Sequence, residues 1–588
     1  MHYKRGWFTG YRSLIDDSAF FLAKNGQRDR HAELEATIAA ILDPDVAKGD
    51  DHAQCRFPAR TRWLTDKMPE LKTKLPKVSC PKYDEAYKVI SPTVASLVFP
   101  STNMSGPASM FGHTMLRLER DNTSPLLGYA ITYAADATDA GVAKYIVYGL
   151  FGGFDGVYSV KPYSAKLTEY SAIELRDVWE YRLKLSPAEV QQMYAHIWEM
   201  SLVKSDYYFF DENCSYNLLF LAEAAREGIH LTDGYITVVP IDTVKDIRRA
   251  GLIDSTQLRP SRITTIQAIA GAIPASSVAL AEKIANKDTS ATINDMFNDN
   301  CSDIERADIL NLAYELVMYN SHSGGLSPEE LRQYQNKLFA ISSAIARLPV
   351  RGTAWNVSQL EVSPDMGHDS KRVSIGAGYG GDSPYISTNF RASYHSPDDN
   401  EAGYRLGVYI TLGELSLRYY TEKEHFSLNK FAVLDVLNLY PLKHFQRGFS
   451  WGLSAGVRDS SIKAEESEYA AYWNLGGGFS IQLSNAIIWA FAYAELASDN
   501  SSSGVLFGSG GRLGVIAPIT DNFKLMIDGR HLTYTDSSEH SESNITAKLA
   551  IYPAINHALV FDANYTNRKF KDTHEDDTSA GLTYSYFF

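Results

Sequence analysis

The pattern of apolar residues changes once along this chain of 588 residues, near residue 354. Before that point apolar residues recur at helical spacing, for example in residues 302–319 and 327–347. After it, segments of about ten residues alternate between apolar and polar side chains and are separated by polar turns such as 395–403 and 571–579. We count about twelve such segments between Lys371 and Phe588. Residues 354–588 are therefore expected to form an all-β domain.

The two faces of these segments differ in polarity, which bears on the kind of β-domain. In the final segment one face is apolar or aromatic and the other is polar: Leu582, Tyr584, Tyr586 and Phe588 against Thr583 and Ser585. A soluble β-sandwich or lipocalin-like barrel turns its apolar face inward. An outer-membrane barrel turns it to lipid, has a polar lumen and carries aromatic residues at its strand ends. The terminal aromatic residue resembles the C-terminal signature of bacterial outer-membrane barrels, so we expect a transmembrane β-barrel.

Composition agrees with a barrel and excludes two other classes. Aromatic residues make up 12% of the chain, with 36 tyrosines, while charged residues make up only 21%. No run approaches the roughly 18 to 20 apolar residues of a membrane-spanning helix. The net charge of −14 argues against a nucleic-acid partner. We expect export to the outer membrane, with outer-membrane lipid as a partner, residues 1–353 in the periplasm and the signal peptide already removed.

The first 353 residues divide into three expected regions. Residues 1–90 are helical and polar, 91–240 mix strands and helices in an α+β domain, and 241–353 are again helical. Cys55 and Cys80 lie 25 positions apart in the first region and are either a disulfide or two buried thiols. In an exported chain the disulfide is expected.

Two stretches of the α+β domain hold candidate catalytic residues. Cys214 follows Asn213, a favourable N-cap residue, and opens an apolar helical stripe. We expect the helix dipole to lower the pKa of its thiol below the value of about 8.5 for a free cysteine. His113 enters a strand from a glycine turn and is a candidate base. The alternatives are a small buried thiol and a structural histidine.

Other chemistries have weaker support in the sequence. The chain has no paired Cys-x-x-Cys and no His-Glu-x-x-His, so we expect no metal and no cofactor. The glycine-rich residues 149–156 lack the lysine of a phosphate-binding loop and predict a turn that another segment approaches closely. Cys301 precedes a helix without a neighbouring aromatic or histidine cluster, and we expect a free structural thiol.

Three segments, FGHTMLRL, YSAIELRDVWEYRLKLSPAE and YYFFDENCSYNLLFLAE, resemble the DUF4105 family, which includes the periplasmic domain of Lnb-type lipoprotein N-acyltransferases. The order of histidine before cysteine also resembles circularly permuted papain-like thiol enzymes. The resemblance implies that Cys214 is the nucleophile and His113 its base. It offers three weaker candidates for orienting the histidine or donating to an oxyanion: Ser109, Asn103 and Asn213. A further matching set is expected to form a packed strand with an ion pair: Arg176, Asp177, Trp179, Glu180 and Tyr181.

The resemblance implies a thiol acyltransferase or hydrolase that works through an acyl-enzyme, on lipids or lipoproteins. One alternative is an amidase or peptidase of the same fold that cuts peptidoglycan or protein. Another is a non-enzymatic channel or assembly scaffold. Lnb-type enzymes have a helical membrane portion, whereas this chain ends in an expected barrel, so the acyl-transfer substrate does not follow from the resemblance.

Overall fold

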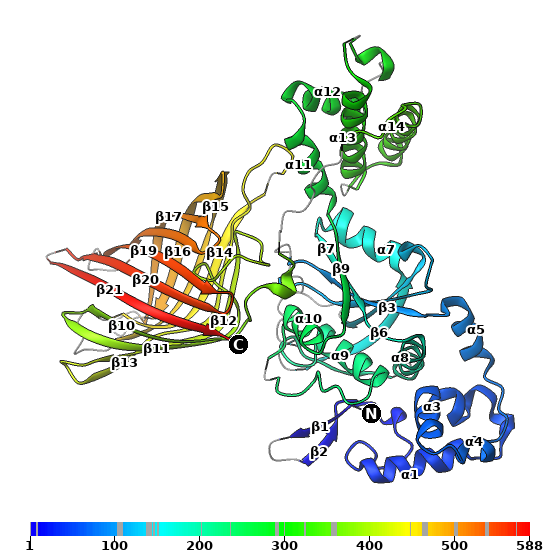
Figure 1. Cartoon of the computed structure of the whole chain (residues 1–588). Helices are drawn as coiled ribbons and strands as arrows, with labels where there is room; N and C mark the ends of the chain where they lie inside the picture. The colour runs from blue at the N-terminus through cyan, green and yellow to red at the C-terminus, as the bar shows by residue number, and fades with distance from the viewer. Residues whose placement is uncertain are drawn as a thin grey trace. The chain divides into compact units, whose positions relative to one another are not determined.

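The structure is a computed structural model of the chain. It describes residues 2–6, 10–102, 110–136, 144, 148–149, 152–201, 203–235, 237–287, 293–298, 300–322, 325–353, 362–446, 448–460, 468–498, 504–535, 540–571 and 573–588. The chain forms two compact units, which are treated separately below: Met1–Asn103 with Phe111–Val357, and Met104–Met110 with Ser358–Phe588 (Figure 1). None of the helices in the described residues has the length and apolar character needed to span a membrane.

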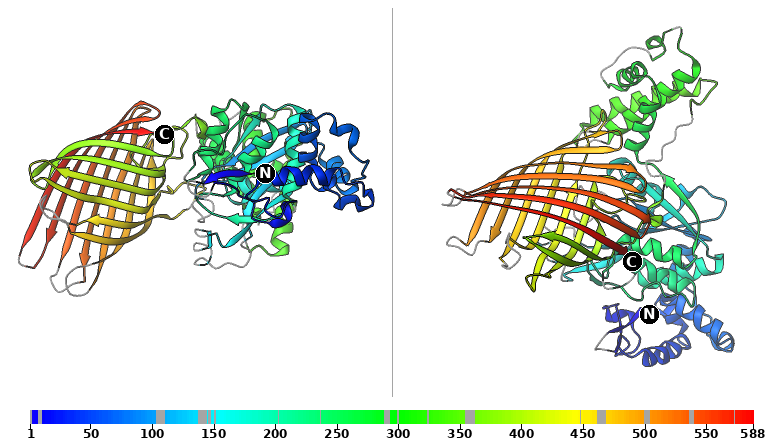
Figure 2. Two further views of the ribbon diagram at one scale, coloured as in Figure 1. Left: turned by 90° about the horizontal axis from the view of Figure 1, so that it is seen from below. Right: turned by 60° about the vertical axis from the view of Figure 1, so that its left-hand side comes forward.

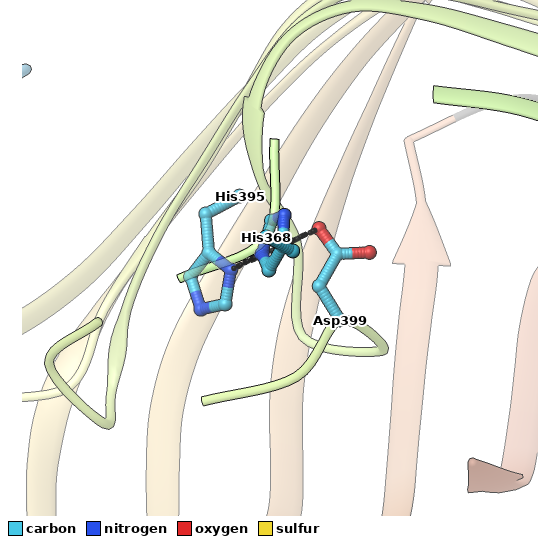
Figure 3. A group of neighbouring side chains, drawn as sticks. All are labelled: His368, His395 and Asp399. Atoms are coloured by element: carbon cyan, nitrogen blue, oxygen red, sulfur yellow. Dashed lines mark hydrogen bonds and ion pairs between the residues drawn. The ribbon is translucent and has the colours of Figure 1, made fainter. Parts of the chain in front are cut away.

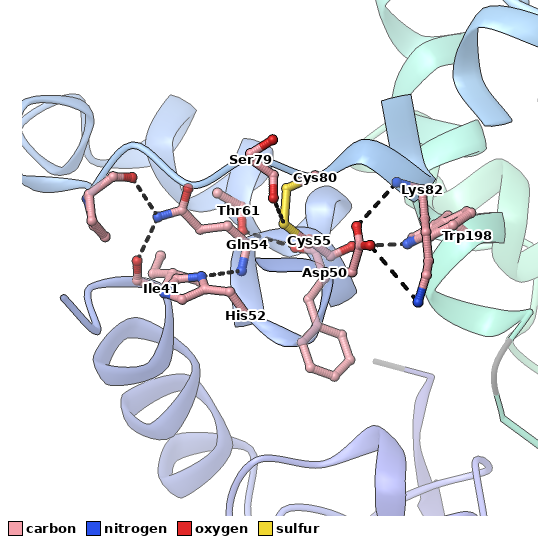
Figure 4. The surroundings of a disulfide bond; sticks show 12 residues. Ile41, Asp50, His52, Gln54, Cys55, Thr61, Ser79, Cys80, Lys82 and Trp198 are labelled. Carbon is pink, nitrogen blue, oxygen red and sulfur yellow. Dashed lines mark hydrogen bonds and ion pairs between the residues drawn. A yellow bond between two sulfur atoms is a disulfide. The ribbon is translucent and has the colours of Figure 1, made fainter. Parts of the chain in front are cut away.

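The N-terminal region is mainly helical, as expected. A hairpin of β1 (Tyr3–Gly6) and β2 (Gly10–Ser13) precedes five helices: α1 (Arg30–Ile41), α2 (Ala53–Arg56), α3 (Pro58–Lys67), α4 (Leu71–Lys74) and α5 (Pro81–Ile90). The expected disulfide is confirmed: Cys55 in α2 is bonded to Cys80, the N-cap residue of α5, with 5.3 Å between their Cα atoms (Figure 4). The indole N–H of Trp198 donates to the Cys55 carbonyl, which ties this bond to a later helix.

Loss of this disulfide is expected to destabilise the N-terminal unit. A cross-link over 25 residues restricts the unfolded chain, and its removal costs about 2–4 kcal/mol. Urea unfolding of the full chain in detergent, followed by fluorescence, should show a lower midpoint for Cys55→Ser/Cys80→Ser. Cys301→Ser, which removes a free thiol, should leave the midpoint unchanged. An unshifted midpoint for the double variant would contradict the prediction.

The α+β domain is built on an antiparallel sheet of seven strands in the order β8-β6-β5-β4-β3-β7-β9. Their bounds are β3 (Val94–Pro100), β4 (Met115–Glu119), β5 (Tyr129–Ala135), β6 (Phe154–Pro162), β7 (Val178–Leu183), β8 (Ser205–Tyr207) and β9 (Ile253–Arg259). The helices are α7 (Tyr163–Thr168), α8 (Pro187–Met200), α9 (Cys214–Ala225) and α10 (Pro240–Arg249), with a π-helical turn, η5 (Glu169–Ile173), after α7. Helix α9 packs on the central strands β4 and β5, which places its N-terminus against the middle of the sheet.

Strand β7 contains three of the residues expected in a packed strand with an ion pair, Trp179, Glu180 and Tyr181, whereas Asp177 and Arg176, which pairs with Glu174 at 2.9 Å, lie just before it. Glu180 is 3% exposed, and its carboxylate lies 2.6 Å from Nη1 of Arg117 on β4. The hydroxyl of Tyr163 donates to the same carboxylate at 2.5 Å, and Arg259 on β9 also pairs with it. Arg117 and Arg259 hold the pKa of Glu180 below its usual value although burial raises it. Glu180 therefore joins strands of the sheet.

The start of the expected helical region 241–353 differs from the prediction, because β9 (Ile253–Arg259) pairs with β7 and extends the sheet. The rest forms helices close to the expected positions: α11 (Arg262–Ala272), α12 (Ala275–Ala285), α13 (Asp303–Ser321) and α14 (Pro328–Ala346). Helix α14 starts as its sequence predicts. Ser327 and Glu330 form a capping box and Pro328 occupies the first turn.

The C-terminal unit is a closed barrel of twelve antiparallel strands, which confirms the expected fold and strand number (Figure 2). The strands are β10 (Arg372–Gly380), β11 (Ser383–His395), β12 (Val408–Tyr420), β13 (His425–Asn438), β14 (Ser450–Asp459), β15 (Tyr469–Leu483), β16 (Ala486–Ser498), β17 (Val505–Thr520), β18 (Phe523–Tyr534), β19 (Ser541–Ala554), β20 (His557–Lys569) and β21 (His574–Phe587). Pairing of β10 with β21 closes it. Closure satisfies the backbone hydrogen bonds of every strand, which a membrane requires.

The barrel wall has the polarity of an outer-membrane protein and not of a soluble barrel. The apolar face of β21 points outward, with Leu582, Tyr584 and Tyr586 each 40% or more exposed. Thr583 and Ser585 from the other face line the interior. The interior encloses a cavity of about 550 Å³ lined by charged side chains. The barrel therefore lies in the outer membrane.

The connection between β11 and β12, residues 396–407, fills one end of the barrel interior. It follows His395 at the end of the barrel where β10 starts and β21 finishes. Asp399 in this connection is fully buried and pairs with Arg391 at 2.5 Å and with Arg372 at 2.9 Å. Lys524 on β18 pairs with Glu401 at 2.8 Å. We call residues 396–407 the plug segment, because buried ion pairs hold them inside the barrel.

Candidate functional site

Cys214 begins α9, as the sequence predicts, and Asn213 caps the helix. The Asn213 side-chain oxygen accepts from the backbone N–H groups of Ser215 at 3.1 Å and Tyr216 at 3.2 Å. Its amide nitrogen donates to the carbonyls of Phe209 at 3.0 Å and Val238 at 2.8 Å. Because both amide hydrogens have carbonyl partners, Asn213 holds the turn that carries the cysteine and does not offer them to an oxyanion.

The sulfur of Cys214 lies in a buried, hydrogen-bonded position. The residue is 5% exposed. Burial raises the pKa of the thiol, while hydrogen bonds from the backbone N–H groups of Thr114 and Ser215 and from the hydroxyl of Tyr207 lower it. The net direction is upward, so the expectation of a lowered pKa was wrong. Desolvation of the thiolate outweighs the helix start and the donors around it.

His113 lies directly before Thr114, the residue that precedes β4, so its backbone is close to the sulfur that Thr114 contacts. Its ring lies 6.0 Å, centroid to centroid, from the ring of Tyr170. Among the described residues, no hydrogen bond joins the ring to Sγ of Cys214. Burial and the positive charges of Arg176 and Lys166 lower the pKa of His113 to about 3. The imidazole is therefore neutral at physiological pH, as a general base must be.

The remaining candidates fall outside this arrangement. Ser109 and Asn103 lie outside the residues that the structure describes. Cys301 is a free, partly exposed thiol just before α13, as expected. The roles of His113 and Cys214 as base and nucleophile stay a prediction.

The sequence did not single out Thr114 or the hydroxyl of Tyr207 as partners of the sulfur. The available signals were the position of Thr114 next to His113 and the cluster of tyrosines just before Cys214. The glycine-rich turn confirms the expected close approach. A Cβ atom would overlap a ring at four of its glycines: Gly149 with Phe209, Gly152 with Tyr208, Gly153 with Tyr148 and Gly156 with Tyr133. The contacts with Phe209 and Tyr208 pack the turn against the segment that leads into Cys214.

Asn213→Ala is expected to destabilise the N-terminal unit by about 2–3 kcal/mol. The change removes an N-cap, which costs about 1 kcal/mol, and leaves two buried carbonyls without their amide donors. Ser186→Ala, which removes the cap of α8 at the surface, should cost about 1 kcal/mol. Urea unfolding of both variants in the full chain measures the difference. Equal losses would show that the buried contacts of Asn213 add nothing to its cap.

Different protein families match separate parts of this chain. Residues 82–250 match the family Lnb N-terminal periplasmic domain, and three domains of unknown function match elsewhere: DUF7843 over 1–67, DUF7842 over 256–352 and DUF7840 over 361–587. DUF4105 itself is not among these four families. The resemblance is therefore supported as far as an Lnb-type periplasmic domain. No curated protein matches the chain.

Solved structures of outer-membrane proteins are similar to a part of this chain. The NanC porin is 10% identical over 37% of this chain and 100% of its own, with a TM-score of 0.24. The KdgM porin is 8% identical over 37% of this chain and 99% of its own, with a TM-score of 0.21. OmpT of Vibrio cholerae is 8% identical over 39% of this chain and 100% of its own, with a TM-score of 0.20.

Proposed function

We propose that this outer-membrane protein, with its periplasmic N-terminal region, is a thiol enzyme that transfers or hydrolyses acyl groups through Cys214. The observation that carries the proposal is the setting of the sulfur. Cys214 opens a capped helix, two backbone N–H groups reach its sulfur, and His113 is adjacent in sequence to one of these donors. The match of residues 82–250 to the Lnb N-terminal periplasmic domain supports the same chemistry.

The proposed reaction starts with the neutral imidazole of His113, which takes the proton of the Cys214 thiol. The thiolate attacks the carbonyl carbon of an ester or amide, and a tetrahedral oxyanion forms. The leaving alcohol or amine departs with the proton from His113, and an acyl thioester remains on the sulfur. An amine or water then attacks the thioester and releases Cys214. A phospholipid as acyl donor and a lipoprotein amine as acceptor suit an enzyme anchored in the outer membrane.

The experiment is a mass measurement of the adduct on Cys214. Full-length protein in detergent is incubated with a short-chain phospholipid and digested, and the peptide that contains residue 214 is weighed. We expect one acyl group on this peptide in wild-type protein and in Cys301→Ala, and none in Cys214→Ala. Heat-modifiable migration of the barrel in gels confirms that each variant has assembled. Equal labelling of Cys214→Ala would refute the proposal.

A non-enzymatic scaffold is the second candidate, favoured by a specific observation. Cys214 is buried with a raised pKa, and the ring of His113 packs against Tyr170 without a hydrogen bond to the sulfur in the described residues. Hydrogen bonds of catalytic groups are often formed only with substrate bound. If phospholipid and a peptide thioester both leave Cys214 unmodified in assembled protein, the scaffold is the better description.

A further inference from the structure

Three buried side chains from separate segments meet at one end of the barrel interior (Figure 3). His368 precedes β10, His395 is the last residue of β11, and Asp399 lies in the plug segment. All three side chains are fully buried. Nε2 of His368 lies 2.9 Å from Nδ1 of His395, and Oδ2 of Asp399 lies 3.9 Å and 3.8 Å from these two nitrogens.

Hydrogen bonds on the far side of each ring orient the two imidazoles. Nδ1 of His368 lies 2.7 Å from the carbonyl of Asp369, an acceptor, so this nitrogen carries a hydrogen. Nε2 of His395 lies 3.4 Å from the carboxylate of Glu401, which also acts as an acceptor. In neutral rings these contacts leave lone pairs on Nε2 of His368 and Nδ1 of His395. Two lone pairs at 2.9 Å repel each other unless a positive charge lies between them.

The three ligand atoms also have the dimensions of a metal site. A triangle with sides of 2.9, 3.8 and 3.9 Å has a circumscribed circle with a radius of about 2.1 Å, which matches zinc–nitrogen and zinc–oxygen bond lengths. One ion can therefore lie at bonding distance from all three atoms, although Oδ2 of Asp399 also accepts hydrogen bonds from Nη1 of Arg391 at 2.5 Å and from the backbone N–H of Ser396 at 2.8 Å. A histidine ring held from behind by a carbonyl or a carboxylate is the usual outer support of a metal ligand.

We propose that His368, His395 and Asp399 bind one divalent first-row transition metal ion, with Zn²⁺ as the best match to two imidazoles and a carboxylate. Arg391 and Arg372 hold the carboxylate of Asp399 in place, and Glu401 supports His395. The ion joins the segment before β10, the end of β11 and the plug segment. It fastens the plug segment to the barrel wall. This site is independent of Cys214.

Metal content is the direct test. Untagged full-length protein in detergent is stripped with a chelator, given an excess of ZnCl₂ and desalted, and the zinc is counted by elemental mass spectrometry. We expect wild-type protein to retain one equivalent of zinc per chain more than either His368→Ala or His395→Ala. His531→Ala, which removes an exposed barrel histidine that contacts Ser543, should retain as much as wild type. With Co²⁺ as the probe, visible absorption bands should appear in wild type and not in the two ligand variants.

Glu401→Gln keeps all three ligands, and it weakens both the support of His395 and the ion pair of Glu401 with Lys524. It therefore tests the site even if the ligand variants fail to assemble. We expect its zinc affinity to fall by about 10- to 100-fold. The proposal is overturned if assembled wild-type protein retains no zinc above the level of the ligand variants. It is equally overturned if Glu401→Gln binds zinc as tightly as wild type. The two rings would then share a proton in place of a metal ion.

Discussion

His113→Ala is expected to slow the acylation of Cys214 by about 10²- to 10⁴-fold, the usual contribution of a general base. Burial raises the pKa of the Cys214 thiol, so almost none of it is ionised at neutral pH without a neighbouring base. The measurement is the rate at which the acyl adduct appears on Cys214 in assembled full-length protein. His230→Ala, which removes an exposed histidine near Asp233, serves as the matched control and should react at the wild-type rate. A loss of less than about threefold in His113→Ala would show that another group takes the proton.

The pH dependence of the same rate tests the state of this base. Burial, Arg176 and Lys166 lower the pKa of His113 to about 3, so the ring stays neutral down to that pH. We therefore expect the wild-type rate to change by less than about twofold between pH 7.5 and pH 5.0. A solvent-exposed imidazole with a pKa of about 6.5 would lose about 30-fold over this range, because protonation removes the base. A fall of that size would contradict the lowered pKa of His113.

The barrel was largely predictable because its signal repeats. Alternation of apolar and polar residues in every segment fixes which side chains face lipid, and Thr583 and Ser585 line the interior as their positions in the pattern predict. Residues 395–403 were different. They are polar and contain proline and glycine, so they predict an ordinary turn. Their true position inside the barrel depends on Arg391, Lys524 and other partners far along the chain, which local pattern does not reveal.

In the candidate site, too, features set by local sequence were predictable and features set by distant residues were not. The start of α9 and the cap at Asn213 follow from local residue preferences, and both are confirmed. The direction of the Cys214 pKa shift was missed because it depends on how deeply the fold buries the sulfur. The histidine pair of the barrel was also missed: His368 and His395 are 27 residues apart and match no metal-binding motif. Only the closed barrel brings these two side chains together.

We also expect a large effect on the barrel. Arg391→Ala should lower the free energy of unfolding of the barrel by about 3–5 kcal/mol. Arg391 is fully buried, and its guanidinium donates to Asp399 at 2.5 Å and to Ser396 at 2.8 Å. Its removal leaves the buried carboxylate of Asp399 with Arg372 as its remaining guanidinium partner. When a buried charge loses an ion-pair partner, most of the free-energy cost of removing it from water is no longer compensated.

Urea unfolding in detergent micelles, followed by the fluorescence of the barrel tryptophans Trp451, Trp473 and Trp489, measures this loss. Arg418→Ala is the matched control, because Arg418 also lines the interior but packs over the ring of Tyr385. We expect it to cost about 1 kcal/mol. Equal losses in the two variants would mean that the ion pair between Arg391 and Asp399 adds nothing to the barrel. A loss in Arg391→Ala that clearly exceeds the loss in Arg418→Ala would show that the plug segment is part of the stable core of the barrel, since Asp399 and Ser396 both belong to it.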